Sequence, residues 1–208
     1  MEGQLLEKGK RSRYEREEGE EGMPKDYRLE RTPANQQRRP QYARDDAWTR
    51  AFLLRAQVAY VATHWDEQPF LTPTLYWYDP GQLKIFLHSN RLGRLRANSE
   101  RHTQVCLAVS EFGKLLPSNI ALEFSIQYAS VVVFGLLKVL TEPEEKRFVL
   151  ESLIHKYFPH LSSGREYRPI TETELLRTTV YAIEIDSWSG KENWADKAVQ
   201  GDEWPSQV

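Results

Sequence analysis

Six stretches rich in β-branched and aromatic residues most limit what this chain can fold into. The first four follow one another with few residues between them and include Val58–Thr63, Phe70–Tyr78, Lys84–His88 and Gln104–Val109. Two further runs, Phe124–Leu140 and Thr179–Ile185, come later. Strands in meander order favour an antiparallel sheet or barrel over a parallel α/β sheet. The sequence therefore predicts a mainly β fold, a β-barrel of about six strands with a few peripheral helices.

Turn residues separate these runs. His64–Gln68 predicts a hairpin between the first two runs. Asp79-Pro80-Gly81 predicts a second turn, with proline where φ is fixed and glycine where φ must be free. Residues Glu111–Asn119 look irregular, and Gly135 predicts a bend or bulge within the fifth run.

Three helices are predicted at the edges of this β-rich part. Asp45 or Asp46 can cap a helix that runs to Arg55. Thr141–Glu144 has the spacing of a capping box and starts a helix to about Tyr157. Thr171–Glu174 repeats that spacing for a short helix. The apolar residues expected to face inward from the second helix are Phe148, Leu150, Leu153 and Ile154.

Composition divides the chain into three parts. Residues 1–44 are dense in charged residues and Gln and predict a disordered N-terminal arm; 45–191 form the folded domain, and 192–208 a tail. A formal net charge of -2 argues against a nucleic-acid binder. No apolar run is long enough to span a bilayer. The single cysteine, Cys106, excludes an internal disulfide. We expect a cytoplasmic protein.

The stretch 84–109 carries the clearest binding signal. Polar side chains gather where a strand stops and a helix begins. Unpaired N–H groups and the positive end of the helix dipole suit an anion there, and an arginine fork can grip two phosphate oxygens. We therefore expect this loop to hold the phosphate of a flavin. The residues concerned are His88, Ser89, Asn90, Gly93, Arg94 and Arg96.

The chain shows no constellation typical of a hydrolase or a metalloenzyme. There is no metal-spaced cluster and no serine elbow. A flavoenzyme needs neither, because the cofactor carries the redox chemistry and the protein supplies orientation and electrostatics.

Four blocks, in order, carry a resemblance to a known family. They are Phe70–Tyr78, then Ile85–Asn90 with Gly93-Arg94, then Tyr128–Gly135, and finally Ser187–Lys191. Together they resemble the pyridoxamine 5′-phosphate oxidase-like superfamily, in the branch related to nitroimidazole reductases. The resemblance covers about residues 46–191. It implies a split β-barrel of the FMN-binding type, a homodimer, and FMN held in a groove between the subunits.

The resemblance also implies roles for particular residues. The strand Thr72, Pro73, Thr74 and Leu75 would lie along the isoalloxazine ring, with the phosphate at His88–Arg96. Ser130, Trp188 and Lys191 would approach from nearby strands or from the partner subunit. Relatives in this branch often have a lysine directly after the residue that matches Arg94, where this chain has Leu95. Arg96 offers a replacement charge.

Structural roles compete with these assignments. For His88, a strand-end histidine competes equally with a flavin contact, and a haem ligand is a lesser alternative. Arg94 and Arg96 are alternatively solvated helix charges, and Trp188 is either a core aromatic or a lid on the flavin. Pro73 within a strand indicates an edge strand or a bulge.

The leading hypothesis is an FMN-dependent oxidoreductase acting on a small organic substrate. Two alternatives are kept: a haem-binding split barrel without flavin turnover, and a non-catalytic module that stores or senses a cofactor. In the last, residues 1–44 would contact a partner.

Overall fold

The computed structural model describes residues 39–202 and 204–205. The expected disorder of residues 1–38 therefore lies outside the described residues. The helical elements are η1 (Pro40–Tyr42), α1 (Asp46–Arg55), α2 (Arg94–Arg101), η2 (Ala121–Glu123), α3 (Pro143–Tyr157) and α4 (Glu172–Arg177). The strands are β1 (Ala43–Arg44), β2 (Val58–Trp65), β3 (Gln68–Leu75), β4 (Trp77–Asp79), β5 (Lys84–Asn90), β6 (Gln104–Leu116), β7 (Ser125–Val139) and β8 (Thr178–Asn193).

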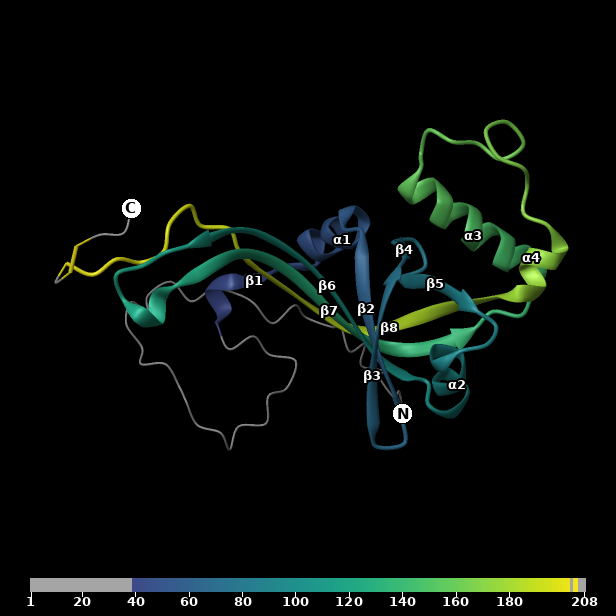
Figure 1. The fold of residues 1–208 in the computed structure, drawn as a ribbon, viewed down its shortest axis with the longest axis horizontal. Helices are drawn as coiled ribbons and strands as arrows, with labels where there is room; N and C mark the ends of the chain where they lie inside the picture. The colour runs from purple at the N-terminus through teal and green to yellow at the C-terminus, as the bar shows by residue number, and fades with distance from the viewer. Residues whose placement is uncertain (1–38, 203, 206–208) are drawn as a thin grey trace, which may run out of the picture. The chain divides into compact units, whose positions relative to one another are not determined.

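All strands belong to one antiparallel sheet of eight strands (Figure 1). Seven follow the order β3-β2-β6-β7-β8-β5-β4, and β1 pairs with β8. The sheet is not closed, because β3 and β4 form the two ends of this path. The predicted mainly β fold with peripheral helices is confirmed, and it is a split barrel. The predicted meander is wrong in part: β5 pairs with β8, which comes last in the chain.

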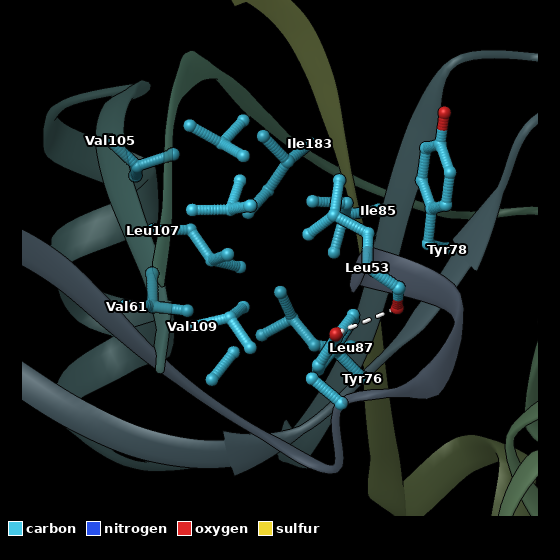
Figure 2. Packing of buried hydrophobic residues seen from close by; sticks show 14 of the residues in the cluster. Leu53, Val61, Tyr76, Tyr78, Ile85, Leu87, Val105, Leu107, Val109 and Ile183 are labelled. Atoms are coloured by element: carbon cyan, nitrogen blue, oxygen red, sulfur yellow. Dashed lines mark hydrogen bonds between the residues drawn. The ribbon is translucent and has the colours of Figure 1, made fainter. Parts of the chain in front are cut away.

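Most of the core lies between the two halves of this strongly bent sheet. Figure 2 shows Val61 and Leu107 pointing toward Ile85 and Ile183, which come from the opposite half. Tyr76 is fully buried beside them, and its hydroxyl donates to the backbone oxygen of Leu53 at 2.7 Å. Full burial of one large apolar side chain contributes about 1.5–3 kcal/mol. A smaller cluster forms where α3 covers β5 and β8, around Phe86, Val149, Leu153, Val180 and Ala182.

Two of the predicted helix caps are confirmed. The Asp45 side chain accepts from the Trp48 N–H at 2.8 Å and caps α1. Thr171 and Glu174 form a complete capping box at α4. The box predicted at Thr141 is wrong, because α3 begins after Glu142 without a side-chain cap. A proline at the first position of α3 already removes one N–H that would need a partner.

Helix α3 buries only part of the predicted set, because Leu153 is buried as predicted but Phe148 is not. Val149 and Leu153 are buried, whereas Phe148 is 56% exposed and packs edge-on against Trp77. Leu150 packs beside the smaller core cluster as a half-buried residue. The difference arises because α3 lies across the end of the sheet. The elements that α3 packs against there determine which of its side chains are buried.

Two strands are longer than their sequence signals. Strand β6 continues through the segment predicted as irregular, with a register shift between Phe112 and Leu115, and β8 extends to Asn193. Both are paired with β7, and these ladder hydrogen bonds override weak local preferences. The bulge predicted at Gly135 is confirmed by a register shift between Phe134 and Gly135.

The turn between β4 and β5 places its left-handed residue elsewhere than predicted. Leu83 has φ of 54°, whereas Gly81 has no positive φ. Gly81 instead donates its N–H to the Asp79 side chain at 2.8 Å. The turn is therefore closed by an aspartate, and not by the conformational freedom of glycine.

The ends of the described region are more ordered than the sequence indicates. Within the predicted disordered arm, η1 and β1 are regular, and β1 pairs Ala43 with Lys191 of β8. In the predicted tail, the Ser118 hydroxyl donates to Val199 O at 2.6 Å and Asn119 Nδ2 donates to Gly201 O at 2.8 Å. None of the described helices has the length and apolarity needed to cross a bilayer.

Candidate functional site

The start of α2 is an uncapped helix N-terminus next to the end of β5. Gly93 is the N-cap, and no side chain accepts from the first N–H groups. Its φ of 144° favours glycine, and open space surrounds the position that a Cβ would occupy. The first backbone N–H groups of α2 thus have no side-chain cap, and a helix N-terminus of this kind favours an anion.

Arg94 stands at the first position of this helix. Its side chain is exposed, and its guanidinium carbon lies 4.6 Å from the ring centroid of Phe70 in β3 and 5.8 Å from that of Trp65. Within the part of the chain that the structure describes, no carboxylate pairs with Arg94. The guanidinium keeps its hydrogen-bond donors available, while its contacts with the two aromatic rings restrict its position.

Arg96 and Leu95 differ from Arg94 in their surroundings. Arg96 pairs with Glu100 at 2.6 Å, so its charge is already compensated. Leu95 is 6% exposed and packs into the main core. A lysine at this position would need to bring its charge into that core, which accounts for leucine there. Of the two predicted arginines, Arg94 is therefore the one whose charge is not already paired with a carboxylate among the described residues.

The residues at the end of β5 do not converge on one point. Ser89 faces the inside of the sheet, where its hydroxyl lies 2.8 Å from the hydroxyl of Tyr181. Asn90 closes the following turn by accepting from the Leu92 N–H at 3.0 Å. His88 precedes Ser89 and so points to the other face of the strand. The structure thus places Asn90 and Arg94 near the helix start and directs His88 away from Ser89.

His88 lines a pocket between β5 and helices α3 and α4. The pocket has a volume of about 510 Å³, and its wall is mainly apolar. Partial removal of water lowers the pKa of His88 below its ordinary value of 6.5, so the imidazole is neutral at pH 7. Other residues of the wall include Leu75, Leu150, Ile154, Tyr157 and Phe158.

Strand β3 offers two different faces. Thr72 and Thr74 are half-buried and share the face of Phe70, on which Arg94 is stacked. Pro73 and Leu75 point to the opposite, exposed face. The strand lies at the edge of the sheet, as Pro73 predicts. Within one chain, the face with Thr72 and Thr74 adjoins the start of α2.

Ser130 and Lys191 are brought together, but far from α2. They are cross-strand partners in β7 and β8, and Lys191 Nζ lies 5.1 Å from the ring centroid of Tyr128. On β8, Lys191 is eleven residues beyond Val180, the partner of His88. At about 3.3 Å per residue this is roughly 35 Å along the strand. One chain therefore does not unite these residues with Arg94 (Figure 1).

Trp188 is packed into the structure. Its indole N–H donates to Asp46 of α1 at 2.8 Å, and its ring lies edge-on to Tyr78 at 6.2 Å. Arg50 covers the ring at 5.0 Å. These contacts pack Trp188 against the main core and connect α1 to the sheet.

The sequence reasoning missed Lys156 in α3. Its side-chain nitrogen is shielded from solvent and donates no hydrogen bond to any of the described residues. In the sequence it resembles any charge on a solvated helix face. Its spacing of eight residues from Phe148 was the available signal, since both then share one face of the helix.

Comparisons with known proteins identify relatives of this fold. A family model described as pyridoxamine 5′-phosphate oxidase matches residues 45–192. The flavocytochrome Anf3 from Azotobacter vinelandii has 25% identity and a TM-score of 0.67, over 78% of this chain and 74% of that one. An FAD and haem binding protein from Mycobacterium smegmatis has 23% identity and a TM-score of 0.67, over 76% of each chain.

A third similar structure has a description that mentions nitroimidazoles. It is a protein from Bacteroides thetaiotaomicron, provisionally described as a 5-nitroimidazole antibiotic resistance protein. It has 21% identity and a TM-score of 0.60, over 71% of this chain and 84% of that one. A comparison with proteins of curated function found no match.

Proposed function

The chain belongs to the pyridoxamine 5′-phosphate oxidase family, and we propose that it is an FMN-dependent oxidoreductase acting on a small organic substrate. The observation that carries this proposal is the uncapped start of α2 beside the guanidinium of Arg94, which pairs with no carboxylate of residues 39–202. A phosphate there would accept hydrogen bonds from backbone N–H groups and from Arg94 together.

The residues present fit a flavin of this kind. The open space at Gly93 leaves room for the phosphate. Thr72 and Thr74 continue from Phe70 along the same face of β3 and would orient the rest of the molecule. Bound flavin would supply the redox chemistry, taking a hydride from a reduced donor and passing electrons to an organic acceptor. The protein would supply position, charge and exclusion of water.

A homodimer is part of this proposal. The outer face of β2 and β3 exposes Val58, Tyr60, Leu71 and Leu75 by 40–64%, an apolar surface that a second copy would cover. A second copy would also bring Ser130 and Lys191 to the flavin, since within one chain Lys191 lies eleven residues along β8 from Val180, the partner of His88. Leu71→Glu should therefore shift the protein toward a monomer in sedimentation measurements and weaken flavin binding together.

Haem is the second candidate cofactor. A neutral imidazole facing an apolar pocket is a competent axial ligand, and His88 is such a group. Anf3 is described as a flavocytochrome and the M. smegmatis protein as binding FAD and haem, which supports testing both cofactors.

The deciding experiment is the absorbance spectrum of purified protein after separate incubation with FMN, FAD and haem and removal of free ligand. Retained flavin bands that are lost in Arg94→Ala support the proposal. A retained Soret band that is lost in His88→Ala supports the haem alternative. Retained flavin without oxidation of any reduced nicotinamide would identify a non-catalytic cofactor-binding module. We place the protein in the cytoplasm, in keeping with its single free cysteine.

A further inference from the structure

A second pocket lies between helices α1 and α3 and the short strand β4. Its volume is about 620 Å³, within the range of small-molecule sites. Trp77 and Tyr78 of β4 form an aromatic and apolar wall together with Phe148 of α3 and Leu54 of α1. Phe148 is 56% exposed and Leu54 is 50% exposed, so apolar surface at this pocket is open to solvent. Because none of the lining residues belongs to the set assigned to the flavin, the pocket is a separate candidate site.

One face of α3 supplies polar groups to this pocket. Glu151, Ser152 and His155 line it together with Phe148. Glu151 and Ser152 follow Phe148 by three and four residues, and His155 follows Glu151 by four, which makes these side chains neighbours on the helix surface. A carboxylate and a hydroxyl group therefore lie beside the aromatic part of the wall.

The carboxylate of Glu151 has no partner among the described residues. The residue is half-buried, and no described side chain or backbone group forms a hydrogen bond or an ion pair with it. An ionised carboxylate can only accept hydrogen bonds, and a charge that is partly shielded from water normally pairs with a charge of opposite sign. A cation is thus the group that this side of the pocket lacks.

Lys156 also lines the pocket but does not supply that cation. It comes five residues after Glu151, a spacing that turns the two side chains toward different faces of the helix. Its Nζ is shielded from solvent and lies 3.5 Å from the ring centroid of buried Tyr76. Burial alone lowers the pKa of Lys156 to about 8, with no carboxylate close enough to raise it. Arg50 is likewise engaged, because it donates to the Tyr78 hydroxyl at 3.2 Å.

We propose that this pocket binds a small aromatic amine in its ammonium form, whose charged group donates to Glu151 while its ring packs against Trp77 and Phe148. The single carboxylate matches the single positive charge of such a ligand. Trp77 and Phe148 meet edge-on with centroids 5.6 Å apart. Aromatic side chains of this kind suit both parts of the ligand, because they pack well against a flat ring and attract a cation.

The test compares two probes of nearly the same shape by calorimetry on the full chain at pH 7. 1-Naphthylmethylamine carries the ammonium group, and 1-naphthalenemethanol is its neutral counterpart. We expect the amine to bind about three- to tenfold more tightly, as for one ion pair and one cation–π contact at a partly exposed site. The preference should vanish in Glu151→Gln, which keeps the shape of the side chain. It should persist in Glu145→Gln, which removes a charge from the same helix outside the pocket.

A further variant tests the aromatic wall. Phe148→Ala should weaken the binding of both probes by about three- to tenfold, and the exposure of this side chain leaves the fold intact. Failure of the amine to bind, equal binding of the two probes, or a preference that survives Glu151→Gln would overturn the proposal. Unchanged binding in Phe148→Ala would contradict the placement of the ring. Competition between the amine and FMN would also overturn the proposal, by placing this pocket within the cofactor site.

Discussion

The guanidinium of Arg94 lies 4.6 Å from the ring centroid of Phe70, which joins the first turn of α2 to the edge strand β3. Arg94 begins a helix, whereas Phe70 lies in an edge strand that comes earlier in the chain. The contact sets the direction of Arg94 and places Thr72 and Thr74 on the adjoining surface. In the proposed complex it connects the phosphate end of the flavin with the rest of the molecule.

Arg94→Ala should weaken FMN binding by about 10- to 100-fold, because a charge-assisted hydrogen bond contributes about 1.5–3 kcal/mol. Arg96→Ala should cost less than about threefold, because Glu100 already compensates Arg96. Quenching of flavin fluorescence on titration measures both affinities. Arg91→Ala is the control, an exposed arginine just before the helix. Equal losses for Arg94 and Arg96 would contradict the assignment.

Trp188→Phe should destabilise the protein by about 1 kcal/mol and leave FMN affinity unchanged. The variant loses the hydrogen bond to Asp46 but keeps an aromatic ring beside Tyr78. Urea denaturation followed by circular dichroism gives the change in the free energy of unfolding. Asp46→Asn removes the charge of the acceptor in the same hydrogen bond. It should also lower the free energy of unfolding, by a smaller amount. A large loss of FMN affinity in Trp188→Phe would instead make this residue a lid on the flavin.

Local features of the fold were predictable because their causes are local. The Asp45 cap and the Thr171 capping box depend on hydrogen bonds within three residues. The Gly135 bulge follows from a glycine within a strand. By contrast, the pairing of β5 with β8 joins distant parts of the chain, and no short pattern specifies it.

The candidate site was predictable only in part for the same reason. The sequence identifies the polar cluster at 88–96, but strand alternation separates His88 from Ser89, and Glu100 neutralises Arg96. The spacing of Lys156 from Phe148 indicates only a shared helix face, because the isolation of its amine results from the way α3 packs on Tyr76.

Lys156→Met should stabilise the protein at pH 7, and this advantage should shrink as the pH rises from about 8 toward 10.5. The folded-state pKa of Lys156 is lowered from 10.5 to about 8, so between these values the unfolded chain binds more protons. Stability of the unmodified protein therefore rises with pH across this window, and the methionine variant lacks this contribution. Thermal denaturation midpoints of both proteins at matched pH measure the difference. A gap independent of pH would show that the amine reaches water in the folded state.

Gly135→Ala should destabilise the protein by about 3 kcal/mol or more. A Cβ at this position would come within 2.2 Å of the backbone oxygen of Glu184, which the ladder between β7 and β8 holds in place. The neighbouring strand β8 must therefore shift next to the register shift between Phe134 and Gly135. Gly81→Ala is the matched control, because Gly81 lacks a positive φ and meets only the Asp79 side chain at 3.2 Å. Its expected change is within about 1 kcal/mol. Comparable losses for the two variants in urea denaturation would mean that β8 accommodates the added methyl group by moving.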